Sequence, residues 1–336
     1  SYRRIGARML VRSSGLWTGG ISGGCLEGDA LKRSQKAIFK GAASKVVYDT
    51  MEDDKNQIGV GLGCNGRIEV LFTPIDPHNP ENEIEQLKRV AITDRPSIFV
   101  KIIDAPEESG LLGKKKLVAT FGLIPDWEGI PSSQLATYVE QTIKKKKPKV
   151  FFTQIEDQPV KLLVEFIRPE TRLIIVGDNY DVMAMLGTAQ HLGWETYVVG
   201  KAKKLSKEVY KMAKKVVDYS QASDLPVHDY TAVMLMSHDY GWDKKMLPLF
   251  AAKQPAYMGM LGPKKRFHKM DKDLSDLDLE GLDFFYSPTG LEIGAESPEE
   301  IALSIAAEIV AVMRNKPGGF LKFKEGTIHE RDPQTV

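Results

Sequence analysis

The sequence predicts an α/β protein with two domains: an N-terminal α+β domain rich in short strands, and a C-terminal Rossmann-like domain with a doubly wound parallel sheet. The chain has 336 residues, which is enough for two domains of about 150 residues each. Its first half shows short β segments joined by glycine-rich turns, whereas its second half alternates short apolar strands with helical patterns. Fully apolar strands that alternate with helices are typical of a parallel sheet covered on both faces.

In the first half, a helix is expected over residues 26–39, ended by Gly41. A second, amphipathic helix is expected over residues 81–93. The lysine-rich stretch at residues 144–149 is interpreted as a solvated loop rather than a phosphate site. Strands are expected at 44–48, 67–72, 97–103 and 116–121, with a turn around Gly110 and a closing hairpin formed by 151–153 and 160–166.

In the second half, the pattern changes at Pro169, which interrupts the chain just before the first apolar strand. The predicted domains are therefore 1–168 and 169–319, followed by a tail at 320–336. Ser297 and Glu300 form a predicted capping box at the start of the last helix. The parallel strands are expected at 173–176, 196–199, 215–217, 232–236 and 256–260.

Composition excludes several classes of protein. Lys and Arg number 46 and Asp and Glu number 45, so the formal charge is +1 and offers no bulk attraction for nucleic acid or an anionic membrane. No apolar stretch reaches the ~18 residues of a membrane span, and no export signal is visible. The two cysteines are too few for a disulfide framework, so a reducing, cytoplasmic location is expected.

The first turn of the second domain departs from a dinucleotide-binding turn. Such a turn needs glycines, because a Cβ keeps the backbone away from a pyrophosphate at the helix N-terminus. Here only Gly177 remains, while Asp178 and Asp181 would repel phosphate, and Gly200 stands where an acidic residue for the ribose is expected. We therefore predict a Rossmann-like architecture for the second domain but do not expect NAD(P) as its cofactor.

Other loops are expected to meet at the carboxyl ends of the strands, where ligands bind in this topology. His238 with Asp239 is interpreted either as an oriented acid–base or ligand pair, or as a histidine that caps a loop. A basic cluster follows Gly262 at an expected helix start, and it is interpreted either as a phosphate site or as a solvated helix end. That cluster consists of Lys264, Lys265 and Arg266.

Two cysteines in the first domain lie in glycine-rich loops. Cys25 comes directly before an expected helix, with Glu27 two residues later, and Cys64 lies in the sequence GLGCNG at residues 61–66. Backbone N–H groups at a helix N-terminus stabilise a thiolate, and glycines let a bulky ligand approach it. A functional thiolate is favoured over a small buried core residue at both positions.

These motifs resemble those of the XdhC/CoxI family of xanthine dehydrogenase accessory factors. The resemblance runs through nearly the whole chain and includes, in the second domain, the long segment GLEIGAESPEEIALSIAAE at residues 290–308. Its other segments are GARM at 6–9, SGGCLE at 22–27, GLGCNGRIE at 61–69, IIVG at 174–177, HDY at 238–240 and MGMLG at 258–262. Residues 1–5 resemble a turn that family members reach after an opening helix and strand, so the natural chain is expected to begin earlier.

The resemblance implies a chaperone without a reaction of its own. It would bind molybdenum cofactor transiently, assist its sulfuration together with a cysteine desulfurase, and help insert it into xanthine dehydrogenase or a related molybdenum hydroxylase. Cys25 would contact the cofactor or its metal, with Cys64 as a second candidate. A homodimer is one candidate assembly, because the sequence does not fix the oligomeric state. The alternative is an NAD(P)-dependent oxidoreductase, in which the lysines at positions 201, 203 and 204 would bind the 2′-phosphate of the nucleotide. The hydroxylase itself is excluded, because its iron–sulfur clusters need about four cysteines each.

Overall fold

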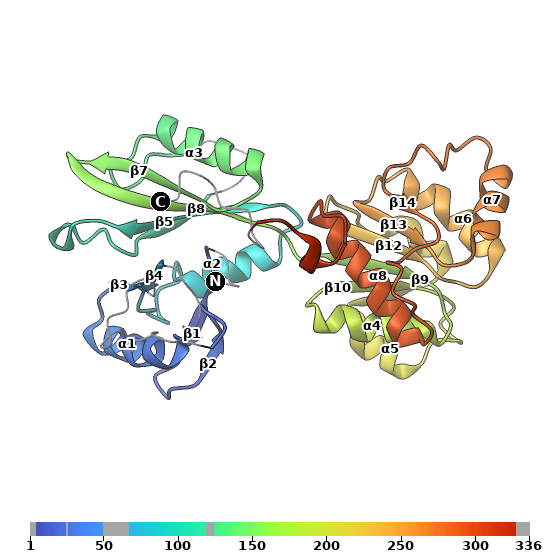
Figure 1. Ribbon diagram of the computed structural model, residues 1–336, viewed down its shortest axis with the longest axis horizontal. Helices are drawn as coiled ribbons and strands as arrows, with labels where there is room; N and C mark the ends of the chain where they lie inside the picture. Colours follow the sequence, from blue (N-terminus) through green and yellow to red (C-terminus); the bar gives the residue numbers. More distant parts are fainter. Residues whose placement is uncertain (1–4, 25, 50–66, 119–123, 327–336) are drawn as a thin grey trace. The chain divides into compact units, whose positions relative to one another are not determined.

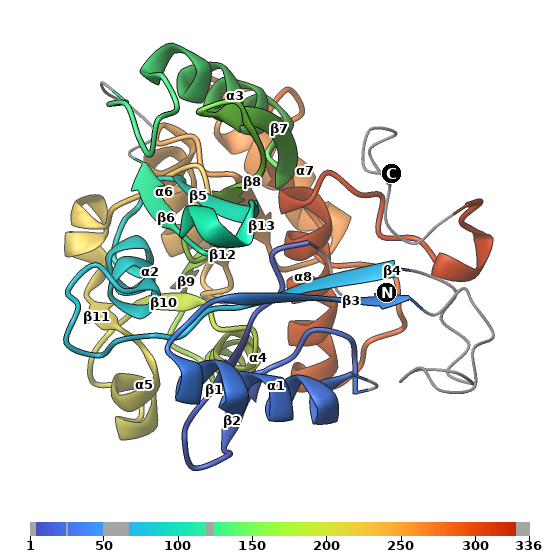
Figure 2. The ribbon, with the colours of Figure 1, turned by 90° about the vertical axis from the view of Figure 1, so that its left-hand side faces the viewer.

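The computed structural model describes residues 5–24, 26–49, 67–118 and 124–326 (Figures 1 and 2). The chain divides into two compact units, Ser1–Pro169 and Glu170–Val336. In Figure 1 the first unit runs from blue to green and the second from green to red.

The first unit contains a four-stranded antiparallel sheet with the order β6-β5-β8-β7. The predicted hairpin of β7 and β8 is confirmed, and it is longer than expected. The strands span Lys115–Val118 (β6), Ser97–Asp104 (β5), Gln158–Ile167 (β8) and Lys149–Ile155 (β7). A short 3₁₀ turn at Glu107–Ser109 precedes Gly110, which has a left-handed φ of 64°, as the predicted turn requires.

A helix that sequence reasoning missed packs on this sheet. Helix α3 spans Ser132–Lys145, and its buried residues include Leu135 and Val139, one helical turn apart. These side chains belong to the same apolar cluster as the central strands of the sheet. The prediction of a loop from residue 144 onward is therefore wrong for Lys144 and Lys145, which form the last turn of α3, although all the lysines at 144–147 are exposed as expected.

The rest of the first unit is a layer of short strands and two helices. Strands β1 (Met9–Val11) and β2 (Trp17–Gly19) pair with each other, as do β3 (Ser44–Asp49) and β4 (Arg67–Phe72), both antiparallel. Helix α1 spans Glu27–Lys40 and ends at Gly41, whose left-handed φ of 64° confirms the predicted stop. Helix α2 spans Glu83–Ala91, inside the range expected for it.

The second unit confirms the predicted parallel sheet. Its six strands have the order β11-β10-β9-β12-β13-β14, and every neighbouring pair is parallel. Strands β9 and β12 are buried along their whole length, which explains why both are apolar except for their first residues, Arg172 and Thr231. The strands span Arg172–Val176 (β9), Glu195–Val199 (β10), Lys215–Val217 (β11), Thr231–Leu235 (β12), Tyr257–Met260 (β13) and Phe285–Tyr286 (β14).

Helices cover both faces of this sheet, so the doubly wound architecture is also confirmed. Side chains of α4 and α8 share one apolar cluster with the sheet, and side chains of α6 and α7 share the other. Ser297 and Glu300 form the predicted capping box of α8. The helices span Asp181–His191 (α4), Lys207–Met212 (α5), Tyr240–Ala251 (α6), Lys264–Asp273 (α7) and Pro298–Met313 (α8), with 3₁₀ turns at Tyr219–Asp224 and Leu321–Phe323. Among the described helices, none is both long and apolar enough to cross a membrane.

Candidate functional site

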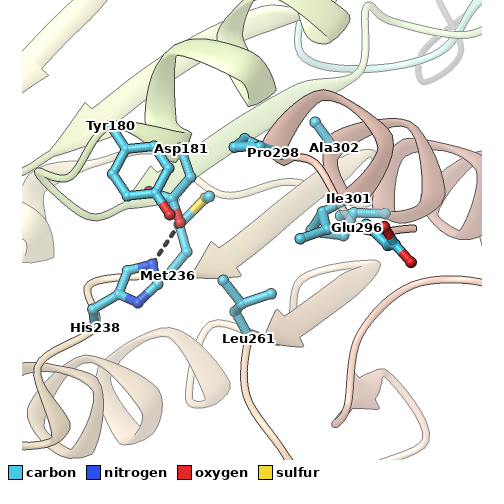
Figure 3. Close-up of a pocket in the computed structure, with 10 residues that line it drawn as sticks. Tyr180, Asp181, Met236, His238, Leu261, Glu296, Pro298, Ile301 and Ala302 are labelled. Atoms are coloured by element: carbon cyan, nitrogen blue, oxygen red, sulfur yellow. Dashed lines mark hydrogen bonds and ion pairs between the residues drawn. The ribbon is translucent and has the colours of Figure 1, made fainter. Parts of the chain in front are cut away.

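Two small cavities lie at the carboxyl edge of the parallel sheet. They fall beside β9 and β12, where the strand order reverses and where this topology places ligands. The first has a volume of about 100 Å³ and the second of about 170 Å³. Figure 3 shows the first cavity, which is lined by Tyr180, Asp181, Met236, His238, Leu261, Glu296, Pro298, Ile301, Ala302 and Ile305.

His238 is held in the first cavity by a carboxylate from a different strand end. Its Nε2 lies 2.5 Å from Oδ2 of Asp181, the first residue of α4, and the two side chains point toward each other in Figure 3. Asp181 is 8% exposed, and His238 has a left-handed φ of 56°. An imidazole fixed by a buried carboxylate has a set orientation and tautomer, so it is suited to accept or donate a proton or a hydrogen bond.

The predicted pair of His238 with Asp239 is therefore wrong. Oδ1 of Asp239 accepts hydrogen bonds from the backbone N–H groups of Gly241 and Trp242, at 2.8 and 3.2 Å. Asp239 thus caps the N-terminus of α6, the usual role of an aspartate at this position. Sequence neighbours project in different directions after a strand, whereas β9 and β12 lie side by side and bring Asp181 to His238.

The turn after β9 is filled by protein atoms. A Cβ on Gly177 would lie 2.6 Å from the carbonyl oxygen of Met236, so this glycine allows two strand ends to approach each other. A Cβ on Gly200 would lie 2.8 Å from the carbonyl oxygen of Gly177 and 2.9 Å from Cβ of Asp178. The glycines at these two positions are thus explained by backbone packing.

Asp178 occupies the space beside that turn. It is 7% exposed, and its carboxylate accepts hydrogen bonds from the backbone N–H of Lys201 at 3.1 Å and from Nζ of Lys204 at 3.2 Å. In a dinucleotide-binding protein the corresponding region leaves room for the ligand. Here a paired carboxylate lies between the first two strand ends.

The predicted basic cluster divides into two kinds of residue. Lys264 and Lys265 are exposed at the start of α7, as expected for a solvated helix end. Arg266 instead turns back over Gly262, where a Cβ would lie 2.6 Å from Cδ of the arginine. Its Nη2 forms an ion pair with the buried carboxylate of Asp243. Of the three, only Arg266 lines the second cavity, together with Met236, His238, Leu261, Gly262 and Pro263.

A polar network that sequence reasoning did not find holds the loop before α8. The hydroxyl of Tyr257, a fully buried residue, donates to Oε1 of Glu308 at 2.6 Å and also hydrogen-bonds the Thr289 side chain. The backbone N–H of Gly290 donates to the same Oε1 at 3.0 Å. Burial raises the pKa of Tyr257 well above its usual value, and the neighbouring Glu308 raises it further. The two ends of the segment 290–308 therefore meet, which fixes the entry to α8 beside the first cavity.

In the first unit, Glu27 organises the loop that precedes α1. Its carboxylate accepts hydrogen bonds from the backbone N–H groups of residues 21, 22, 23, 24 and 26 and from the Ser22 hydroxyl, at 2.6 to 3.3 Å. Burial opposes ionisation, but the hydrogen bonds from Ser22 and Ile21 lower the pKa of Glu27 to about 2. Glu27 is thus occupied by its own loop, rather than presented to a ligand as predicted.

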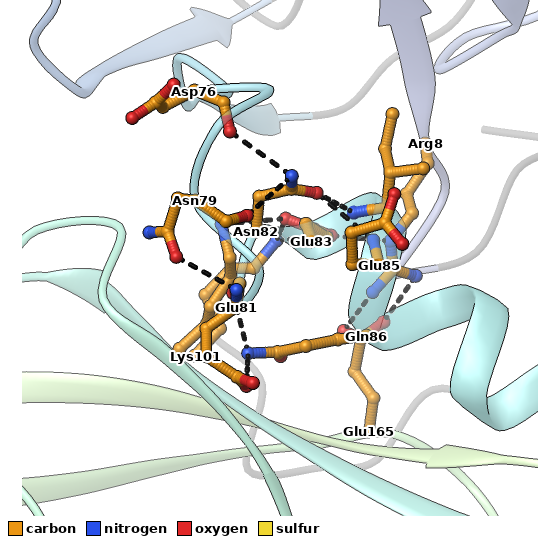
Figure 4. Close-up of polar contacts among 12 residues, drawn as sticks. Arg8, Asp76, Asn79, Glu81, Asn82, Glu83, Glu85, Gln86, Lys101 and Glu165 are labelled. Atoms are coloured by element: carbon orange, nitrogen blue, oxygen red, sulfur yellow. Dashed lines mark hydrogen bonds and ion pairs between the residues drawn. The ribbon is translucent and has the colours of Figure 1, made fainter.

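A largely buried ionic cluster also joins Arg8, which directly precedes β1, to helix α2 and to the four-stranded sheet (Figure 4). Arg8 contacts Oε2 of Glu165 at 2.7 Å and Oε1 of Glu83 at 2.9 Å, while Nζ of Lys101 lies 2.8 Å from both oxygens of Glu83. Burial would raise the pKa of Glu83, but Lys101 and Arg8 lower it to about 2. For Glu165, burial outweighs its cationic neighbours and raises the pKa. In the sequence, Arg8 was recognised only as part of the GARM segment at residues 6–9.

The two cysteines predicted as ligands, Cys25 and Cys64, lie outside the described residues. Within the described ranges, no group of three or more His, Cys, Asp or Glu side chains is arranged to hold a metal ion.

Comparisons with known proteins match both units. The model of the XdhC and CoxI family matches residues 1–49, and that of the XdhC Rossmann domain matches residues 173–309. A Bacillus subtilis protein named as a probable subunit of xanthine dehydrogenase is 26% identical over 317 residues, which cover 92% of this chain and 88% of that protein. The molybdenum cofactor insertion chaperone PaoD of Escherichia coli is 21% identical over 316 residues, which cover 92% of this chain and 79% of PaoD.

A solved structure shares the fold. It is the crystal structure of a Bacillus halodurans protein described as a xanthine dehydrogenase, with 27% sequence identity and a TM-score of 0.75. The similarity covers 94% of this chain and 88% of that protein.

Proposed function

Because the chain belongs to the XdhC and CoxI family, we propose that it binds molybdenum cofactor and helps insert it into xanthine dehydrogenase or a related molybdenum hydroxylase. The observation that carries this proposal is the similarity over 92% of the chain to a protein named as a molybdenum cofactor insertion chaperone. On this proposal the chain acts in the cytoplasm, receives sulfur for the cofactor from a cysteine desulfurase, and catalyses no reaction of its own.

The first turn leaves little space for a dinucleotide, because a Cβ on Gly177 would lie 2.6 Å from the carbonyl oxygen of Met236. Asp178, with its partner Lys204, also occupies the region beside the first turn. These features weigh against the oxidoreductase alternative, which needs an extended nicotinamide nucleotide at that turn.

The residues proposed to bind the cofactor are assigned for each unit by itself. In the second unit they are His238, Arg266 and, at the surface, Lys264 and Lys265, while Gly177 and Asp239 shape the backbone around them. In the first unit, Cys25 is proposed as the sulfur ligand or guard of the molybdenum, with Cys64 as the second candidate and Glu27 as the residue that orders the adjoining loop. Thiolate is a ligand that soft metal centres prefer.

Copurification tests the proposed binding. The full chain is coexpressed with the cofactor biosynthesis enzymes, purified without oxygen, and assayed for molybdenum and pterin. We expect both in equal amounts, and we expect neither from a host that cannot make the cofactor. NAD(H) and NADP(H) should bind no tighter than about millimolar, a free energy of only ~4 kcal/mol. Micromolar nucleotide binding without pterin would contradict the proposal.

A reconstitution assay tests insertion and sulfuration separately. Cofactor-free xanthine dehydrogenase is mixed with the loaded protein, with and without a cysteine desulfurase and cysteine. We expect molybdenum transfer in both mixtures, and higher enzyme activity only where the desulfurase supplies sulfur. Transfer no faster than that of free cofactor would contradict the insertion role, and activation unaffected by the desulfurase would contradict the sulfuration role alone.

A further inference from the structure

We propose that the two cavities at the edge of the parallel sheet form one site for a planar heterocycle that is rich in N–H donors and carries an anionic group. The ring would lie in the cavity of Asp181, and the anionic group would lie in the cavity of Arg266. The inference rests on the proposed function and deepens it, because a pterin with its ring N–H, amino group and attached phosphate belongs to this chemical class.

The two cavities adjoin each other. Met236, His238 and Leu261 line both of them, so these three side chains form a shared wall. Figure 3 shows His238 and Leu261 at the border of the first cavity, with Asp181 pointing toward the imidazole. A ligand with two chemically different parts joined by a short link therefore reaches both cavities.

The charged groups of the two cavities are opposite in sign. The charged residues of the first are the carboxylates of Asp181 and Glu296, and no lysine or arginine lines it. The charged residue of the second is Arg266, whose Nη2 is paired with the buried carboxylate of Asp243 and whose Nε has no partner. The first cavity therefore favours hydrogen-bond donors, and the second favours an anion.

One residue that lines each cavity also carries a buried polar atom without a hydrogen-bond partner. In the described part of the chain, four buried side-chain atoms lack a hydrogen-bond partner, and they include Oδ1 of Asp181 and Nε of Arg266. Such an atom destabilises the folded state unless a hydrogen-bond partner satisfies it. One atom is an acceptor in the acidic cavity and the other is a donor in the basic cavity, so a ligand with N–H groups and an anion satisfies both.

His238 gives the first cavity an oriented hydrogen-bonding group. Its Nε2 is engaged by Asp181, so Nε2 carries the proton and Nδ1 is left as an acceptor when the imidazole is neutral. The remaining lining is apolar and comes from Met236, Leu261, Pro298 and Ile301 among others, which suits the faces of a flat ring.

Three small fluorescent compounds test the site in the full-length chain. Pterin-6-carboxylate has both the amino group and an anion, lumazine-6-carboxylate has an oxo group in place of the amino group, and pterin lacks the anion. We expect pterin-6-carboxylate to bind at least tenfold more tightly than either of the others. Saturable binding is measured by fluorescence titration and by calorimetry.

Two conservative variants separate the two cavities. Asp181→Asn should abolish the preference for the amino compound while keeping the preference for the carboxylate. Arg266→Lys keeps a cation beside Asp243 but loses Nε, so it should abolish the preference for the carboxylate alone. Glu299→Gln is the matched control, because this exposed carboxylate lies in the first turn of α8 and lines neither cavity. It should bind all three compounds as the wild type does, and circular dichroism checks that each variant is folded.

The outcomes distinguish this site from the proposed function. Equal binding of the three compounds by the wild type, no saturable binding up to millimolar concentration, or unchanged preferences in both folded variants would overturn the site. If molybdenum and pterin still copurify with the wild type in those cases, the accessory function stands and the cofactor binds elsewhere. If the compounds bind as expected but no molybdenum copurifies, the site stands and the proposed function fails.

Discussion

Replacing Arg8 with methionine should destabilise the first unit strongly. Arg8 makes three contacts in the buried cluster: Nη2 and Nη1 lie 2.7 and 3.2 Å from the oxygens of Glu165, and Nε lies 2.9 Å from Oε1 of Glu83. The Glu165 side chain is only 5% exposed, so the substitution leaves a buried carboxylate without its ion-pair partner. Breaking such a pair from one side typically costs ~3 to 5 kcal/mol.

The structure places the expected loss near the lower end of that range. Glu83 keeps Lys101, whose Nζ lies 2.8 Å from both of its oxygens, so only Glu165 loses its close partner. The pKa of Glu165 is already raised by burial, and the carboxyl group then escapes part of the penalty by binding a proton. We therefore expect a loss of about 3 kcal/mol at pH 7, a large fraction of the ~5 to 15 kcal/mol that stabilises a domain.

A double-mutant cycle isolates the pair. Glu165→Met leaves Arg8 with Glu83 and with 35% of its side chain exposed, so it should cost less than Arg8→Met. The double variant should be more stable than Arg8→Met alone, because no buried charge is then unpaired. Lys88→Met is the matched surface control, since its pair with Glu85 is mostly exposed and should contribute under ~1 kcal/mol.

The assay must report on the first unit separately, because two units need not unfold together. Hydrogen exchange of the β5 and β8 amides in increasing urea serves this purpose, with one set of measurements for each variant. A loss below about 1 kcal/mol for Arg8→Met, or a double variant no more stable than that single variant, would refute the reasoning.

Three further predictions concern the proposed functional residues. The pKa of Glu27 is lowered to about 2 by the hydrogen bonds of its loop, so its contribution to stability is present above pH 4.5 and is lost as the pH falls toward 2. Glu27→Gln should remove this part of the acid dependence, which thermal unfolding from pH 7 to pH 2 measures against the wild type. Cys25→Ser should keep the melting temperature but reduce bound molybdenum and client activation, with a similar or smaller effect for Cys64→Ser, because serine is a neutral hydroxyl at neutral pH. Full occupancy and activation in Cys25→Ser would contradict a thiolate role. Joint replacement of Lys264 and Lys265 by alanine should weaken binding of pterin-6-carboxylate about fivefold at low salt and less at high salt. The reason is that the two exposed charges together contribute only ~1 kcal/mol. An unchanged affinity would show that the two lysines belong to a solvated helix end and do not bind the ligand.

Local patterns were sufficient for the elements whose signals lie within a few residues. The alternation at Arg67–Phe72 matches the observed strand at both ends, and the capping box at Ser297 begins α8 as expected. The strands at 172–176 and 231–235, which are apolar except for Arg172 and Thr231, required burial on both faces, which only helices on each side provide. Helix α3 also had a local signal, because Leu135, Val139 and Thr142 recur at helical spacing and are buried.

The partners of the polar residues could not be deduced in the same way. The sequence placed His238 beside Asp239 and grouped Arg266 with two lysines, since neighbours along the chain are the only neighbours it shows. The fold pairs His238 with Asp181, 57 residues away, and Arg266 with Asp243, 23 residues away. Arg8 and Glu165 are separated by 157 residues, so nothing local indicated their ion pair.

The sequence by itself determined the class of the fold, most of the order of its strands and helices, with α3 missed, and the strand edge at which a ligand site was to be sought. Hydrophobic periodicity and capping residues act over a few positions, so they can be recognised in a single chain. Only the tertiary structure decided which charges are free, which are paired and which glycines serve packing. Those properties depend on strands that lie next to each other in space, such as β9 and β12, which bring together residues that are remote in the sequence.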